Sequence, residues 1–140
     1  VTDSQKDIYR SFCRGIRDNN IQKRQKLNRR ETGTQYEERA AEYLIAQNYQ
    51  ILERNYRIRS GEIDIIARDG TVLVFIEVKY RKNEESGNPL EAVDIRKQKK
   101  IINVARYYLY QKKYGDVPCR FDVIGICGSH IEHIKDAFWA

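Results

Sequence analysis

The sequence has few of the residues that define several classes of small protein. Its three cysteines, Cys13, Cys119 and Cys127, fit neither a disulfide framework nor the Cys-x-x-Cys spacing of a zinc site, so we expect free thiols. Its two histidines, His130 and His133, lie near the end of the chain and do not support a metal site of their own. No apolar run approaches the roughly 20 residues that span a bilayer, and the first residues lack the apolar core of a signal peptide. These absences predict a cytoplasmic protein without a membrane partner.

Positive charge, in contrast, is in excess and is unevenly placed. The 140 residues are 41% hydrophobic and 33% charged, as is typical of one soluble globular domain, and the formal net charge is +6. Residues 1–32 carry nine Lys and Arg against four Asp and Glu. We expect an amphipathic helix from about Ser4 to Arg17 and a polar, mobile linker from Gln22 to Arg30, followed by a domain over residues 33–140. The basic extension either contacts nucleic-acid phosphates or is a solvated segment whose helix packs on the domain.

Residues 61–81 are the most informative stretch of the domain. Two apolar runs flank Asp69 and Gly70, and an Asp-Gly pair between such runs predicts a β-hairpin with a two-residue turn. With this turn, Arg68 pairs with Thr71. The same register puts Asp64 opposite Phe75 and Glu62 opposite Glu77.

Four charged side chains share one face of this predicted hairpin: Glu62, Asp64, Glu77 and Lys79. Charged groups in strands this apolar are costly to bury without a partner. Three carboxylates repel one another unless a cation lies among them, and Mg²⁺ binds carboxylate oxygens while keeping several of its waters. The pattern predicts a metal-dependent phosphodiesterase site in which Lys79 orients water or holds the phosphate. The alternative is a surface cluster of ion pairs that contributes little.

Five longer segments carry a resemblance to a known family. They are GTQYEERAAEYL from Gly33, ILERNYRIRSGEIDIIARDG, VFIEVKYR, GNPLEAV-x-x-x-KQ-x-KI from Gly87, and RFDVI from Arg120. Together they resemble the YraN-type family of small proteins, from Gly33 to about Phe138. Asp64 and the later Glu77-Val78-Lys79 also resemble the PD-(D/E)xK nuclease signature, although no proline precedes Asp64. The resemblance implies a fold akin to that of Holliday-junction resolvases.

The first helix and the long later helix add further candidate site residues. Gly33 to Asn48 is predicted to be a helix, with Thr34 and Glu37 forming a capping box. The resemblance implies that Glu37 is also a metal or water ligand, and the two roles are compatible. Lys97 falls on the apolar stripe of a helix predicted from Pro89 to about Tyr110, so it either snorkels past the core or points toward the acids. The match of Lys97 and Gln98 to the family motif implies contacts with substrate phosphate.

The remaining pattern completes an α/β domain. Tyr49–Ile58 and Arg120–Cys127 read as strands, and residues 131–134 as a short edge element. Arg54, Arg57 and Arg59 give the first strand a basic fringe. We predict a small mixed sheet flanked by helices, with a restriction-endonuclease-like core.

The functional hypothesis is a nuclease that uses Mg²⁺ or Mn²⁺. It assigns metal binding to Glu37, Asp64 and Glu77, a supporting role to Glu62, catalysis to Asp64, Glu77 and Lys79, and substrate binding to Lys97 and Gln98. DNA is the favoured substrate, with branched or flapped forms among the options and a homodimer as one arrangement. The rivals are a nucleic-acid-binding module that does not cut and a protein-interaction factor in which the acids pair with Lys79.

Overall fold

The computed structural model describes residues 22, 23, 25, 32–82 and 87–140. The chain divides into two units, residues 1–35 and 36–140. Of the first unit, Gln22, Lys23, Gln25 and residues 32–35 are described, and all are helical, although Gln22–Arg30 was predicted to be a linker. The helix predicted over residues 4–17 lies outside the described residues. Within the described part of the chain, none of the helices is long and apolar enough to cross a membrane.

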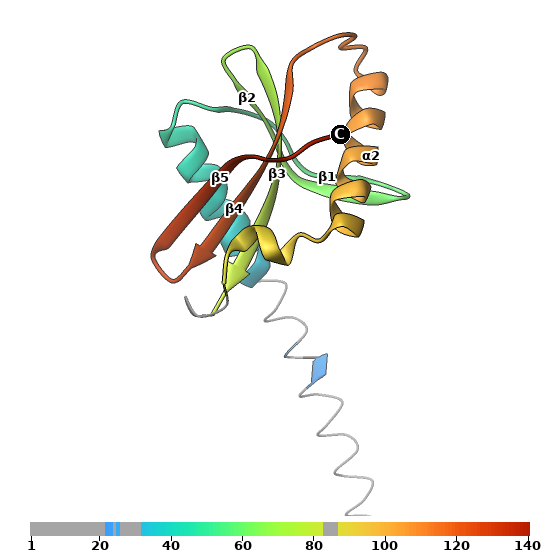
Figure 1. Ribbon diagram of the computed structural model, residues 1–140. Coiled ribbons are helices and arrows are strands. Elements are labelled where there is room, and N and C mark those ends of the chain that lie inside the picture. Colours follow the sequence, from blue (N-terminus) through green and yellow to red (C-terminus); the bar gives the residue numbers. More distant parts are fainter. Residues whose placement is uncertain (1–21, 24, 26–31, 83–86) are drawn as a thin grey trace, which may run out of the picture. The chain divides into compact units, whose positions relative to one another are not determined.

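The second unit is built on a five-stranded mixed sheet with the strands in chain order (Figure 1). The strands are β1 (Gln50–Ile58), β2 (Gly61–Asp69), β3 (Val72–Arg81), β4 (Cys119–Cys127) and β5 (His130–Phe138). Neighbours are antiparallel except β3 and β4, which run parallel. Parallel strands need a crossover, and here it contains the 3₁₀ helix η2 (Pro89–Ala92) and the helix α2 (Ile95–Gln111). The predicted α/β class with a small restriction-endonuclease-like core is confirmed.

Helices cover both faces of the sheet and create two apolar cores. The first core packs Ile101, Val104 and Tyr108 of α2 against Ile66 and Phe75. On the other face, the helix over residues 32–46 packs its small apolar residues against the sheet, in a second core that contains Ala40, Ala41, Leu44, Ile65, Val74, Ile76 and Ile124. Because side chains alternate along a strand, β2 and β3 each supply residues to both cores.

The turn between β2 and β3 lies one residue later than predicted. Asp69 pairs with Val72, so the two loop residues are Gly70 and Thr71 rather than Asp69 and Gly70. Gly70 has φ +59, which suits the first central position of a hairpin turn. Asp69 stays in the strand, where its carboxylate lies 3.1 Å from Arg120 Nη1 on β4. The pairing moves by two positions, which keeps residues 65–69 and 72–76 on their predicted faces. The alternation breaks earlier in β2, because Ile63 lies in the same core as Ile66 whereas Ile65 lies in the other, so Glu62 does not follow the predicted alternation with Asp64.

The long helix predicted from Pro89 is two elements. Pro89 does occupy the first turn, after an Asn88 cap. This turn is the separate 3₁₀ helix η2, which Val93 caps at its C-terminal end. Asp94 is extended, and its side chain accepts a hydrogen bond of 2.8 Å from the Lys97 N–H, so it caps a new helix. The stripe of Ile101, Val104, Ala105 and Tyr108 is buried as predicted.

Two smaller expectations were also wrong. Thr34 is not the cap of the first helix, because Thr32 and Gly33 before it are already helical. The element after β4 is a full strand of nine residues, since β5 pairs with β4 from His130 to Phe138.

Candidate active site

Asp64 and Glu77 lie beside each other on neighbouring strands under α2. The pairing of β2 with β3 ends at Ile65 and Ile76, and Asp64 and Glu77 are the next residues on the two strands. Asp64 Oδ2 accepts a hydrogen bond of 2.8 Å from the Val78 N–H, which replaces the backbone ladder at this point. Asp64 is 9% exposed and Glu77 is 5% exposed. The sheet therefore buries two neighbouring carboxylates in an apolar layer.

This placement changes the acidity of Asp64. Burial raises its pKa from 3.8 to about 8, with a further increase from the negative charge of Glu77. The Val78 hydrogen bond acts in the opposite direction but does not compensate. Asp64 therefore retains a proton near neutral pH unless a positive charge comes close.

Two lysines approach Glu77 from different elements. Lys79 Nζ lies 3.5 Å and Lys97 Nζ 3.6 Å from Glu77 Oε1. Lys97 thus points from α2 toward the acids and does not snorkel past the core. The other oxygen, Glu77 Oε2, is buried and has no hydrogen-bond partner among the described residues. A buried carboxylate oxygen without a partner is costly, so this atom is suited to a cation or a donor from outside the protein.

The remaining predicted acids lie around this pair. Glu37 comes from the helix over residues 32–46 and is half-buried, and its charge contributes to the raised pKa of Asp64. Glu62 acts on Asp64 in the same way but is already held by Arg57, whose Nη2 lies 2.8 Å from Glu62 Oε2. Across the described residues, no three His, Cys, Asp or Glu side chains are gathered into a ready-made metal site.

The donor set still fits a hard divalent ion. Mg²⁺ is commonly held by one or two carboxylates, with waters and substrate phosphate completing its coordination. Asp64 and Glu77 supply the two carboxylates, and the unpartnered Glu77 Oε2 supplies a free lone pair. Glu37 is the third group that could join them.

Gln98 and Lys97 differ in how accessible their polar atoms are to a ligand. Gln98 is half-buried, and its Nε2 donates a hydrogen bond of 2.9 Å to the Val93 carbonyl, where it holds the junction between η2 and α2. Lys97 remains 34% exposed and also lines a surface groove. Of the two predicted substrate residues, Lys97 is the more available to a ligand.

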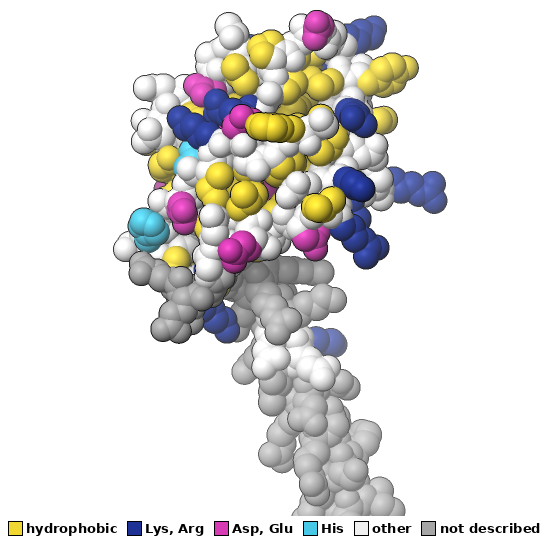
Figure 2. Space-filling view, viewed as in Figure 1, with side chains coloured by type: hydrophobic (Ala, Val, Ile, Leu, Met, Phe, Trp, Pro, Cys, Tyr) yellow, Lys and Arg dark blue, Asp and Glu magenta, His cyan; other side chains and the backbone are white. Residues whose placement is uncertain are grey.

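The groove is basic and adjoins the acids. It has a volume of about 340 Å³ and is lined by Arg57, Ile58, Arg59, Ser60, Gly61, Glu62, Lys97 and Lys100. Lys and Arg side chains gather on this side of the molecule, where α2 approaches the β1–β2 turn (Figure 2). Of the predicted basic fringe, Arg54 is used elsewhere, since it lies 2.7 Å from Glu38 on the helix over residues 32–46.

Sequence reasoning missed a second polar cluster, around Asp122. This residue is fully buried and accepts hydrogen bonds from Arg120 Nε, at 2.8 Å, and from the Asp136 N–H, at 3.0 Å. His133 Nε2 lies 2.7 Å from its other oxygen. Burial alone would raise the pKa of Asp122, but the hydrogen bonds from His133 and Arg120 lower it below its ordinary value. The signal was an acid inside the apolar strand over residues 120–127.

Comparisons with known proteins place the chain in a family. A family model described as "Uncharacterised protein family UPF0102" matches residues 36–126. A UPF0102 protein of Lachnoclostridium phytofermentans is 51% identical over 113 residues, covering 80% of this chain and 96% of the relative. A UPF0102 protein of Fusobacterium nucleatum is 47% identical over 81% of this chain and 95% of its own length. One of Chlorobium chlorochromatii is 50% identical over 78% of this chain and 92% of its own length. On this similarity, the chain belongs to the uncharacterised protein family UPF0102.

Proposed function

We propose that this protein is a nuclease that uses Mg²⁺ or Mn²⁺ to hydrolyse phosphodiester bonds in DNA, with branched or flapped DNA as its preferred form. The observation that carries the proposal is the buried pair Asp64 and Glu77, with Glu77 Oε2 unpartnered among the described residues. Two adjacent carboxylates in an apolar layer are unfavourable without a cation. A structural role alone would be served better by apolar side chains at these positions.

The residues divide the reaction among them. Asp64 and Glu77 would hold the metal, with Glu37 as a further ligand and Glu62 in support through its pair with Arg57. The metal when bound supplies charge stabilisation for the attacked phosphate and activation of water. Lys79 Nζ, which lies 3.5 Å from Glu77, would orient the attacking water or stabilise the phosphate. Water oxygen bonds to phosphorus, the bond from phosphorus to one sugar oxygen breaks, and that oxygen leaves with a proton.

The groove next to the acids supports nucleic acid as the substrate. Arg57, Arg59, Lys97 and Lys100 outnumber its single acid, Glu62, which Arg57 already neutralises. Such a surface favours a phosphate backbone without reading its sequence. A strand bound in the groove would lie beside Lys97, which lines the groove and forms an ion pair with Glu77.

The test combines metal binding with cleavage. We expect Mn²⁺ to raise the unfolding temperature of the wild-type protein, because a ligand that binds only the folded state stabilises it. Asp64→Asn should lose most of this shift and all cleavage of labelled duplex, flap and junction DNA. Nucleic-acid binding should remain. If Asp64→Asn unfolds the domain and metal affects neither form, Asp64 is structural and the nuclease proposal is wrong.

A second candidate is a nucleic-acid-binding module that does not cut. The ion pairs of Lys79 and Lys97 with Glu77 favour it, because they partly neutralise the acids without a metal. Binding of DNA together with no Mn²⁺ stabilisation would support this candidate over the nuclease.

A further inference from the structure

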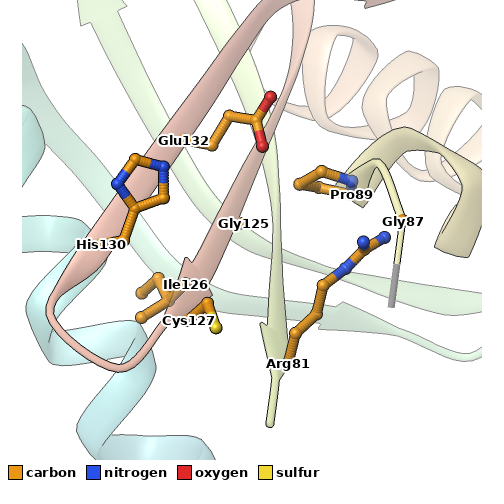
Figure 3. Close-up of a pocket in the computed structure, with 8 residues that line it drawn as sticks. All are labelled: Arg81, Gly87, Pro89, Gly125, Ile126, Cys127, His130 and Glu132. Carbon is orange, nitrogen blue, oxygen red and sulfur yellow. The ribbon is translucent and has the colours of Figure 1, made fainter. Parts of the chain in front are cut away.

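A second cavity lies on the same face of the sheet as the buried acids, further along β3. Its volume is about 250 Å³, and it is lined by Arg81, Gly87, Pro89, Gly125, Ile126, Cys127, His130 and Glu132 (Figure 3). Arg81 of β3 pairs with Cys127 of β4, and Cys127 pairs with His130 of β5. Arg81, Cys127 and His130 therefore lie side by side on β3, β4 and β5. The cavity lies at this end of the sheet, where β3 and β4 end and β5 begins.

The position of this cavity relative to the acids follows from the strand period. Glu77, Lys79 and Arg81 are alternate residues of β3, so their side chains share a face at intervals of roughly 6.6 Å. Lys79 pairs with Gly125 on β4, and Arg81 pairs with Cys127. Gly125 and Cys127 are alternate residues of β4, so both lie on this face. If the phosphate of a strand lay at Lys79 and Lys97, its neighbouring nucleotide would fall near the cavity.

The walls of the cavity suit a flat ring with polar edges. Pro89 packs on Gly125 so closely that a Cβ at residue 125 would lie 2.2 Å from Pro89 Cγ. This contact makes part of the cavity wall apolar. Glu132 and His130 come from β5, and Arg81 comes from β3 with its guanidinium pointing toward Gly87 and Pro89 (Figure 3). The Glu132 carboxylate accepts hydrogen bonds, whereas the Arg81 guanidinium donates them.

The Arg81 guanidinium, at the wall of the cavity, is only partly satisfied, and its Nη1 is buried. Its Nη2 donates to the Asn88 carbonyl, but Nη1 has no hydrogen-bond partner among the described residues. Nucleobases combine an apolar face with edge donors and acceptors, and proteins bind unpaired bases by stacking and by hydrogen bonds to these edges. Small-molecule sites usually begin at about 300 Å³, so 250 Å³ suits one base and not a base pair.

We propose that this cavity, the base cavity, receives one unpaired nucleobase of the strand that is held at the neighbouring acids. The inference rests on the proposed function, because it names the substrate class of that site: nucleic acid with an unpaired nucleotide next to the bound phosphate. A paired base enters such a cavity only after it leaves the stack, which disfavours continuous duplex. The base cavity thereby gives a physical basis for a preference for flaps or branches.

Cys127 provides a direct test, because its thiol lines the base cavity. The full-length Asp64→Asn variant in EDTA can bind DNA without cutting it. Its alkylation by iodoacetamide is followed by mass spectrometry of each cysteine peptide. Exposed Cys119, at the start of β4, is the internal control. We expect flapped DNA to slow alkylation of Cys127 at least fivefold and to leave Cys119 unchanged, whereas fully paired DNA of equal length should protect neither thiol.

A pair of matched variants tests the rim. Glu132→Gln keeps the shape of the side chain and should weaken binding of flapped DNA several-fold relative to duplex, as measured by fluorescence anisotropy. Glu42→Gln is the control, since Glu42 is an exposed residue of the helix that packs on the other face. Equal effects of the two variants would show that only net charge matters, and would overturn the proposal.

The outcomes separate this inference from the nuclease proposal. Protection of Cys127 by flapped DNA together with no metal-dependent cleavage would support the base cavity and reject the nuclease. Cleavage of flapped DNA without protection of Cys127 would reject the base cavity alone. Protection by free nucleoside monophosphates but not by flapped DNA would also overturn it, because the ligand would then be a soluble nucleotide.

Discussion

Asp64 is the residue whose chemistry departs most from its ordinary behaviour. Its pKa is raised to about 8 by burial and by the negative charge of Glu77, so near neutral pH it is largely protonated in the metal-free protein. A divalent ion must displace that proton in order to bind. Metal affinity should therefore increase with pH up to about 8.

The raised pKa gives a prediction about the stability of the metal-free protein. Between pH 3.8 and about 8 the folded state holds a proton that the unfolded chain has lost. The free energy of unfolding should thus decrease as pH rises through this range, by up to about 1.4 kcal/mol per pH unit. Urea denaturation in EDTA at several pH values measures this slope. Asp64→Asn should remove the part of this slope that comes from Asp64. If the free energy of unfolding has the same pH dependence in both proteins, the slope does not come from Asp64.

Lys79 should matter for rate more than for metal binding. It lies 3.5 Å from Glu77, but Lys97 lies at nearly the same distance and remains when Lys79 is replaced. Lys79→Ala should therefore keep Mn²⁺ stabilisation while cleavage falls by about 10²-fold or more, the scale of losing one charge that stabilises a transition state. Lys99→Ala, an exposed change on α2, is the control. Loss of metal binding in Lys79→Ala would contradict the division of roles.

Asp122 has a structural task that is distinct from the active site. Asp122 is fully buried, pairs with Arg120 and binds His133, so its loss leaves the partly buried Arg120 guanidinium short of one partner. Asp122→Asn should lower the free energy of unfolding by about 3–5 kcal/mol. Chemical denaturation checks this, with the exposed Asp116→Asn expected within about 0.5 kcal/mol of wild type. Equal stability of the two variants would show that the cluster is not a source of stability.

At the scale of elements, the close packing of η2 on β4 depends on one glycine. A Cβ at Gly125 would lie 2.2 Å from Pro89 Cγ, whereas a Cβ at Gly61 would lie 3.2 Å from Val104 Cγ2. Gly125→Ala must displace η2 and should cost about 1–3 kcal/mol, with a smaller cost for Gly61→Ala. Thermal unfolding compares the two. A larger loss in Gly61→Ala would mean that η2 moves away easily.

The same elements show where sequence reasoning succeeds and where it stops. Local patterns predicted β1 to β4 and the stripe of α2, because these depend on periodicity. The hairpin turn lies one residue later than predicted, and Asp69, which stays in the strand, contacts Arg120, 51 residues away, a contact that no local pattern indicates. The break before α2 had a local signal that was overlooked, since Asp94 is a good cap. Asp122 had a signal of its own, as an acid inside an apolar strand, but its contact with His133 and the base cavity arise only from strand pairing, which the sequence does not reveal.

For the molecule as a whole, the basic segment should affect binding without affecting the fold. Both cores are formed by residues from Ala40 onward. Deleting residues 1–32 should therefore leave the unfolding temperature of the domain nearly unchanged. If the segment contacts phosphates, the deletion should weaken DNA binding and reduce its salt dependence, measured by anisotropy at several salt concentrations. If the salt dependence of DNA binding is unchanged by the deletion, residues 1–32 make no phosphate contacts and are only a solvated extension.

The parallel pairing of β3 and β4 has a consequence for the order of folding. The β2–β3 hairpin joins Asp64 and Glu77 through a two-residue turn, whereas β4 can pair with β3 only after the whole crossover has closed a long loop. Local contacts form faster than distant ones because loop closure costs less entropy. During synthesis the two acids would meet early, as an exposed and solvated pair. The two acids become buried, and the cavity beside them forms, only when β4 pairs with β3. A chain whose synthesis has not reached β4 would therefore expose the two acids without that cavity.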